Sequence, residues 1–129
     1  MRTALLIVLG LAIGIIGTVF AMRAIDERNP FPQALMVTMG FHRHQAQQAI
    51  KAQRCDAAAN VAQLQHMQMI ASDIPAAFPD APQPFQDLAS HLRSALQTAA
   101  QSAPADCTAL ASALKPVDQV CKDCHQQYR

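Results

Sequence analysis

The sequence predicts an all-α protein, an up-down-up-down four-helix bundle that follows an N-terminal transmembrane or signal helix. Hydrophobic residues make up 51% of the 129-residue chain and are mostly Ala, Leu, Val, Ile and Met, with no Trp and one Tyr. No segment alternates apolar and polar residues with the period of two that a half-buried strand requires. Four stretches instead repeat apolar residues every three or four positions, as amphipathic helices do.

The first helix is the apolar run at residues 4–22, in which Thr18 is the only polar side chain. A helix of this length can span the hydrocarbon core of a bilayer, about 30 Å. A cleaved secretory signal is the alternative, with Arg2 before the run and a cleavage site at residues 19–21. We expect an uncleaved anchor, because the run exceeds the roughly 15 apolar residues of a usual signal core.

Both alternatives export the rest of the chain. We expect an anchored protein on the periplasmic side of the bacterial inner membrane, or a soluble periplasmic protein if the segment is cleaved. The organisation is then residues 1–22 as anchor or signal, 23–31 as a charged, proline-bounded linker, and 32–129 as one domain. The formal net charge of +1 and the scattered basic residues argue against a nucleic-acid partner.

Four helices fill the domain. The first begins near Pro32, the second opens at Cys55 and Asp56 after a polar break, and the third spans residues 83–101. Residues 73–84 contain four prolines, so we expect a loop there without helix. The predicted inner faces are Leu35, Met39, His42, Ala46 and Ala49; Ala57, Val61, Leu64, Met67 and Ile70; and Phe85, Leu88, Leu92, Ala95, Leu96 and Ala99.

The fourth helix has a regular apolar stripe, and Pro116 should either kink it or mark its true start. The stripe consists of Leu110, Leu114, Val117, Cys121, Cys124 and Tyr128. Short connections make successive helices antiparallel. The end of the last helix therefore lies beside the start of the first helix and the end of the second. We expect Leu35, Met36 and Met39 from the first helix there, with His66, Met67, Met69 and Ile70 as further neighbours from the second.

The chain ends in CKDCHQQYR, residues 121–129. A thioredoxin-like redox pair would need a βαβ setting, and zinc would need two more suitably spaced ligands. Cys-x-x-Cys-His is the attachment signature of c-type haem. Thiols three residues apart share one side of a helical turn, so Cys121 and Cys124 can form thioethers with the two vinyl groups while His125 binds the iron. We predict one covalently bound haem c.

Cys55 and Cys107 each precede a helix, and both fall at the end of the bundle away from the haem. An oxidising compartment allows a disulfide between them. Helices two and four are diagonal in the bundle, so the Cα atoms must approach within about 7 Å. We predict this disulfide, with two free buried thiols as the alternative.

Residues 121–129 resemble the C-terminal end of the cytochromes c′, four-helix-bundle haem proteins whose haem motif is followed by an aromatic and a basic residue. MVTMGFHRH, residues 36–44, is similar to their first helix. The resemblance covers residues 30–129. It implies Met36 at the distal position, Tyr128 on the haem edge and Arg129 near the propionates. It departs from the family at Pro32, where the family often has Arg.

The resemblance implies two classes of function. With His125 and Met36 as axial ligands, the protein is an electron carrier for redox partners of the respiratory chain. With His125 alone, it is a five-coordinate haem protein that binds nitric oxide or carbon monoxide. We expect no enzyme, because the apolar face of Leu35, Met36 and Met39 offers no acid–base group. A homodimer through the first two helices is also compatible with the resemblance.

Overall fold

The computed structural model describes residues 2–26 and 30–128 and divides into two compact units, Met1–Pro30 and Phe31–Arg129. The first unit holds α1 (Arg2–Asp26). Its window Leu6–Arg23 has a mean hydropathy of 2.2 over 18 residues and no buried share, so its length and composition suit a membrane span. The predicted N-terminal apolar helix is therefore confirmed. A signal sequence has the same properties, so the helix is compatible with both a membrane anchor and a cleaved signal.

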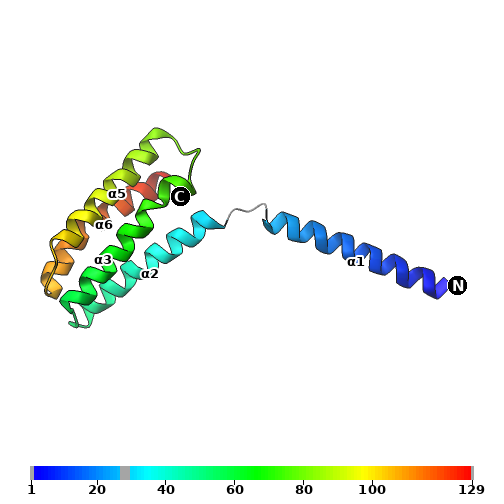
Figure 1. Cartoon of the computed structure of the whole chain (residues 1–129), viewed down its shortest axis with the longest axis horizontal. Helices are drawn as coiled ribbons and strands as arrows, with labels where there is room; N and C mark the ends of the chain where they lie inside the picture. The colour runs from blue at the N-terminus through cyan, green and yellow to red at the C-terminus, as the bar shows by residue number, and fades with distance from the viewer. Residues whose placement is uncertain (1, 27–29, 129) are drawn as a thin grey trace. The chain divides into compact units, whose positions relative to one another are not determined.

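The second unit is a bundle of four long helices (Figure 1): α2 (Phe31–Lys51), α3 (Ala57–Ser72), α5 (Gln83–Gln101) and α6 (Cys107–Tyr128). Each helix packs against the next in the chain, and α6 closes the ring against α2. This arrangement confirms the predicted all-α bundle. It also places the end of α6 between the start of α2 and the start of α5, which is what positions the candidate site.

Aliphatic side chains from all four helices form the core. Leu64 and Met67 of α3, Leu96 of α5 and Leu110 of α6 have no exposed surface. The remaining buried apolar residues are Leu35, Met39, Ala46, Ala71, Ile74, Ala77, Phe85, Ala89, Leu92, Ala99, Leu114 and Val117. Burial of a large aliphatic side chain stabilises the fold by about 1.5–3 kcal/mol, so this core supplies a large part of the driving force for folding.

Two side-chain hydrogen bonds stabilise the bundle at the start of α3. The Asp56 carboxylate accepts a hydrogen bond of 2.9 Å from the Ala59 amide and caps the helix. Asn60 is buried at 3% exposure, and its Nδ2 donates to the Pro104 carbonyl across 3.0 Å. A buried amide without a partner costs free energy, so loss of this contact would destabilise the fold. The bond therefore holds α3 against the segment before α6.

A disulfide joins Cys55 to Cys107 at the same end of the bundle, with a Cα–Cα distance of 5.2 Å. It links the segment before α3 to the first residue of the diagonal helix α6. The bond can form because Cys55 lies in the segment before α3, so the bodies of the two diagonal helices need not approach each other.

One expectation about proline is wrong, and one of the two alternatives for Pro116 is excluded. Residues 73–84 contain one helical turn, α4 (Ile74–Ala77), because Pro75 occupies its first turn, where no backbone N–H is required. Pro116 does not mark the start of the last helix, which begins at Cys107 and continues through it. Pro116 and Ser112 are exposed, so the carbonyl that loses its backbone donor lies on the solvent side.

Candidate functional site

The last two turns of α6 carry the Cys-x-x-Cys-His motif. Cys121 and Cys124 are half-buried free thiols, and His125 is exposed. Residues three apart on a helix are neighbours on one face, and His125 follows directly on the adjacent side. The helix therefore presents two thiols and one imidazole together at one end of the bundle.

The surroundings of the two thiols favour their neutral form. Burial raises the pKa of Cys121, and the nearby Arg43 guanidinium partly offsets that rise. Burial also raises the pKa of Cys124. An apolar environment penalises the charged thiolate. Both cysteines are therefore held in the protonated thiol form.

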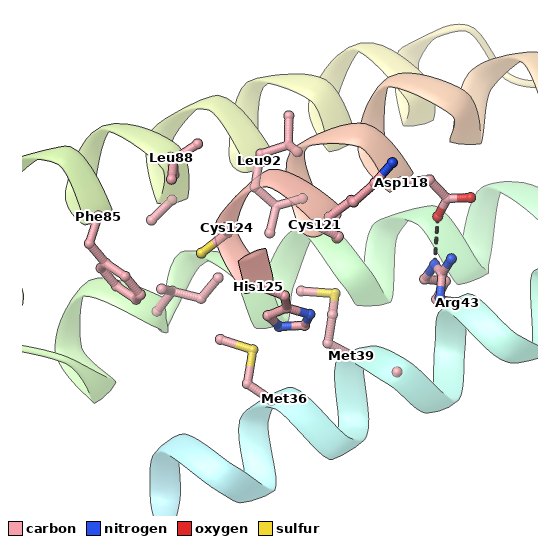
Figure 2. Close-up of a pocket in the computed structure, with 15 residues that line it drawn as sticks. Met36, Met39, Arg43, Phe85, Leu88, Leu92, Asp118, Cys121, Cys124 and His125 are labelled. Atoms are coloured by element: carbon pink, nitrogen blue, oxygen red, sulfur yellow. Dashed lines mark hydrogen bonds and ion pairs between the residues drawn. The ribbon is translucent and has the colours of Figure 1, made fainter. Parts of the chain in front are cut away.

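A cavity of about 210 Å³ lies in front of these residues, between α2, α5 and α6. Figure 2 shows Met36 and Met39 projecting from α2 towards the His125 imidazole, while Cys121 and Cys124 lie above them on α6. The wall on the α5 side is apolar and consists of Phe85, Leu88, Ala89 and Leu92. Gly40, Ile74 and Val120 complete the apolar lining.

A second cavity, of about 420 Å³, shares Met36, Phe85, Cys124 and His125 with the first. Its further lining residues are Gln33, Val37, Phe78 and Tyr128. Tyr128 packs edge-on against Phe85 with ring centroids 5.3 Å apart. The shared residues therefore separate two hollows, and the second is bordered by the exposed side chains of Gln33, Val37 and Tyr128.

An ion pair borders the first cavity on its side away from Met36. The Arg43 Nε donates to the Asp118 carboxylate, joining α2 to α6. Gln47 donates to the other carboxylate oxygen across 3.4 Å. The hydrogen bond that Arg43 donates to Asp118 is the main reason that the pKa of Arg43 is raised. The charges of Arg43 and Asp118 thus pair with each other at this margin, and Lys122 is a further charged residue of the lining.

The structure places the predicted residues unevenly. Met36, Met39, Cys121, Cys124 and His125 line one cavity, and Tyr128 lines the second. Leu35 lies in the core at 5% exposure and lines neither cavity, because its side chain is rotated by one residue, about 100°, from Met36. Arg129 lies outside the described residues.

No residue of α3 lines either cavity within the part of the chain that the structure describes. The expectation that His66, Met67, Met69 and Ile70 border the haem is therefore wrong. Met67 is fully buried in the core and Met69 is 64% exposed. Helix α3 is diagonal to α6 in the ring, so α2 and α5 stand between its side chains and the end of α6.

The apolar wall on α5 was not predicted from the sequence. Phe85, Leu88, Ala89 and Leu92 lie in the first half of α5, and the short connection to α6 makes the two helices antiparallel. The start of α5 must then lie beside the end of α6. The sequence did contain information on this wall, because three of these four residues were on the predicted inner face of the helix.

The residues at this site fit a covalently attached haem. Haem c needs two neighbouring thiols, an imidazole next to the second thiol and an apolar enclosure. The end of α6 supplies the thiols and the imidazole, and α2 and α5 supply the enclosure. Met36 adds a thioether, a ligand that iron accepts in c-type cytochromes.

Residues 80–129 match the family model described as Cytochrome C'. The matched segment contains α5, α6 and the complete Cys-x-x-Cys-His motif. The match confirms the resemblance that the C-terminal residues indicated, and the cofactor of this family is one covalently attached haem c. No curated protein and no solved structure matches the chain.

Proposed function

We propose that this chain, which matches the cytochromes c′ over α5 and α6, is a periplasmic electron carrier whose haem iron is bound by His125 and Met36. The family match supports a c-type haem protein that transfers electrons or binds gases. The axial ligands and the choice between these two functions are our proposal. They rest on the geometry of the first cavity.

One observation carries the choice of Met36: its side chain lines the same cavity as Cys121, Cys124 and His125, from the neighbouring helix α2. Met36 is half-buried, so its thioether is neither locked in the core nor directed into solvent. Met39 lies one turn further along α2 and is buried at 6% exposure, where it packs with the core. Met36 is therefore the better placed of the two methionines.

When bound, the haem supplies a reversible one-electron couple. Cys121 and Cys124 hold it in place, and His125 provides the proximal nitrogen. The Met36 thioether favours ferrous iron and raises the reduction potential. The apolar walls from α2 and α5 would limit the access of water to the bound group, and a drier environment would also favour a higher reduction potential. These are the properties of an electron carrier.

Gas binding is the second function that the cavity supports. If Met36 only fills space, as methionines in cores often do, then the iron has one protein ligand. The apolar lining from Met39, Leu88 and Leu92 would then enclose an open coordination position. A small uncharged diatomic molecule suits such a lining better than water does.

The absorption and electron paramagnetic resonance spectra of the ferric holoprotein test this choice. We expect a six-coordinate low-spin haem with the sulfur-to-iron charge-transfer band of Met–His ligation. Met36→Ala should convert it to a high-spin haem that binds carbon monoxide in the ferrous state and has a lower potential. Met39→Ala, in the same cavity, is the control and should keep the low-spin spectrum. An unchanged spectrum in Met36→Ala would show that Met36 is not a ligand, and a high-spin wild-type protein would favour gas binding.

We further propose that α1 remains attached and anchors the domain to the periplasmic face of the inner membrane, where respiratory redox proteins are its partners. The length and hydropathy of Leu6–Arg23 support this proposal. Intact mass spectrometry of the protein recovered from membranes tests it. A mass that includes residues 1–22 supports an anchor, whereas a shorter, soluble protein supports a cleaved signal.

A further inference from the structure

Two histidines outside the haem site face each other across neighbouring helices. His42 of α2 and His66 of α3 have ring centroids 4.8 Å apart, at an interplanar angle of 47°. Neither ring lines the cavities described above. His66 is exposed and His42 is half-buried, so the pair lies at the surface of the α2–α3 contact and is accessible to small solutes.

A glutamine orients the inner histidine of this pair. The Oε1 atom of Gln63 lies 2.8 Å from Nδ1 of His42. A carbonyl oxygen only accepts hydrogen bonds, so Nδ1 carries the proton and Nε2 keeps its lone pair. Metal-binding histidines commonly have this arrangement, in which a hydrogen bond from one ring nitrogen fixes the tautomer and leaves the other nitrogen free for the metal.

We propose that His42 and His66 form a binding site for a divalent transition metal, with Cu²⁺ as the preferred ion. Imidazole nitrogen suits copper, nickel and zinc, and affinities of divalent ions for such ligands peak at copper. Among the described residues there is no group of three or more His, Cys, Asp or Glu that could hold a metal. The protein therefore supplies two nitrogen ligands, and water fills the other positions.

The site bridges two helices that are already in contact, which lowers the cost of binding. His42 lies within α2 and His66 within α3, and both helices are fixed by the core. Chelation by rings on two fixed helices, one of them already oriented by Gln63, costs less ordering than chelation by two mobile side chains. His42 is six residues beyond Met36, about 9 Å along the helix axis, so the metal site is separate from the haem and does not depend on the proposed axial ligands.

Titration of the purified full-length holoprotein with Cu²⁺ tests the proposal, with affinity from calorimetry and ligand type from the copper signal in electron paramagnetic resonance. We expect one copper ion per chain with two equivalent nitrogen couplings. His66→Gln should weaken binding at least tenfold and remove one coupling. Because His66 is exposed, this variant keeps the fold even if His42→Gln does not. Gln63→Leu should weaken binding by about 10–100-fold, since it removes only the orienting hydrogen bond.

His44→Gln is the matched control. His44 also lies on α2 and also contacts a glutamine, with 3.3 Å between its Nε2 and Nε2 of Gln48. Among the described residues, no ring contact joins it to a histidine on a neighbouring helix. This variant should bind copper as the wild type does, and Ni²⁺ and Zn²⁺ should bind the wild type more weakly than Cu²⁺. Copper affinity that is unchanged in His66→Gln, or lost in His44→Gln, would overturn the proposal.

Discussion

Replacement of both Cys55 and Cys107 by Ser removes the cross-link at the end of the bundle opposite the haem site. The two cysteines are 52 residues apart in the sequence. In the chain-entropy treatment, the release of a loop of that length destabilises the folded state by about 4 kcal/mol. Both side chains are half-buried, so the exchange of sulfur for oxygen adds little packing loss.

Guanidinium denaturation of the purified holoprotein, followed by far-ultraviolet circular dichroism, measures this loss. We expect a fall of about 4 kcal/mol in the free energy of unfolding, and a drop in Tm on the order of 20 °C for a domain of this size. Wild-type protein treated with a thiol reductant is the control. Its thioethers to haem survive reduction, so it should match the double variant.

A loss below about 1 kcal/mol would refute the reasoning, since it would mean that the denatured chain is not restricted by the bond. A loss in the variant without a loss in the reduced wild type would attribute the effect to the serine side chains. The haem spectrum should stay unchanged in both samples, because the bond lies at the other end of α6.

The remaining predictions concern the bundle itself. Leu110→Ala empties a fully buried position and should cost about 2–5 kcal/mol in the same denaturation assay; a cost under 1 kcal/mol would contradict the assigned core. Asn60→Ala leaves the Pro104 carbonyl without that donor and should cost about 1–3 kcal/mol, which a neutral result would contradict. Asp118→Asn weakens a half-exposed ion pair and should cost less than about 1 kcal/mol, so a loss of several kcal/mol would show a larger role.

The helices were predictable from the sequence where periodicity and breaks agreed. The range 83–101 was predicted for the third bundle helix, and α5 spans Gln83–Gln101. Asp56 was expected near the start of the second, and it caps α3. Proline was harder to interpret. Its effect depends on its position within a turn and on exposure, and Pro75 and Pro116 each occupy a place where the missing donor costs little.

The site was predictable in its chemistry and less so in its enclosure. The Cys-x-x-Cys-His motif is local, so its residues share one helical turn whatever the rest of the chain does. Its neighbours depend on which helices are adjacent in the ring. The contribution of α2 was expected correctly. Helix α3 was expected as the other neighbour of the site, but α6 packs against α2 and α5, and α3 is diagonal to it. The pairs Arg43–Asp118 and His42–His66 join different elements, and no local pattern indicates them.

The length of α6 has a consequence for how the protein matures. Its compartment must oxidise two cysteines while it leaves two others reduced for haem attachment, and four cysteines allow three pairings. Cys107 and Cys121 are 14 residues apart on one helix, about 21 Å, which is far beyond the roughly 7 Å that a disulfide can bridge. Once α6 has formed, this distance prevents Cys107 from forming a disulfide with Cys121 or Cys124. Cys107 is then available to Cys55, whereas Cys121 and Cys124 are left to each other and to the cofactor.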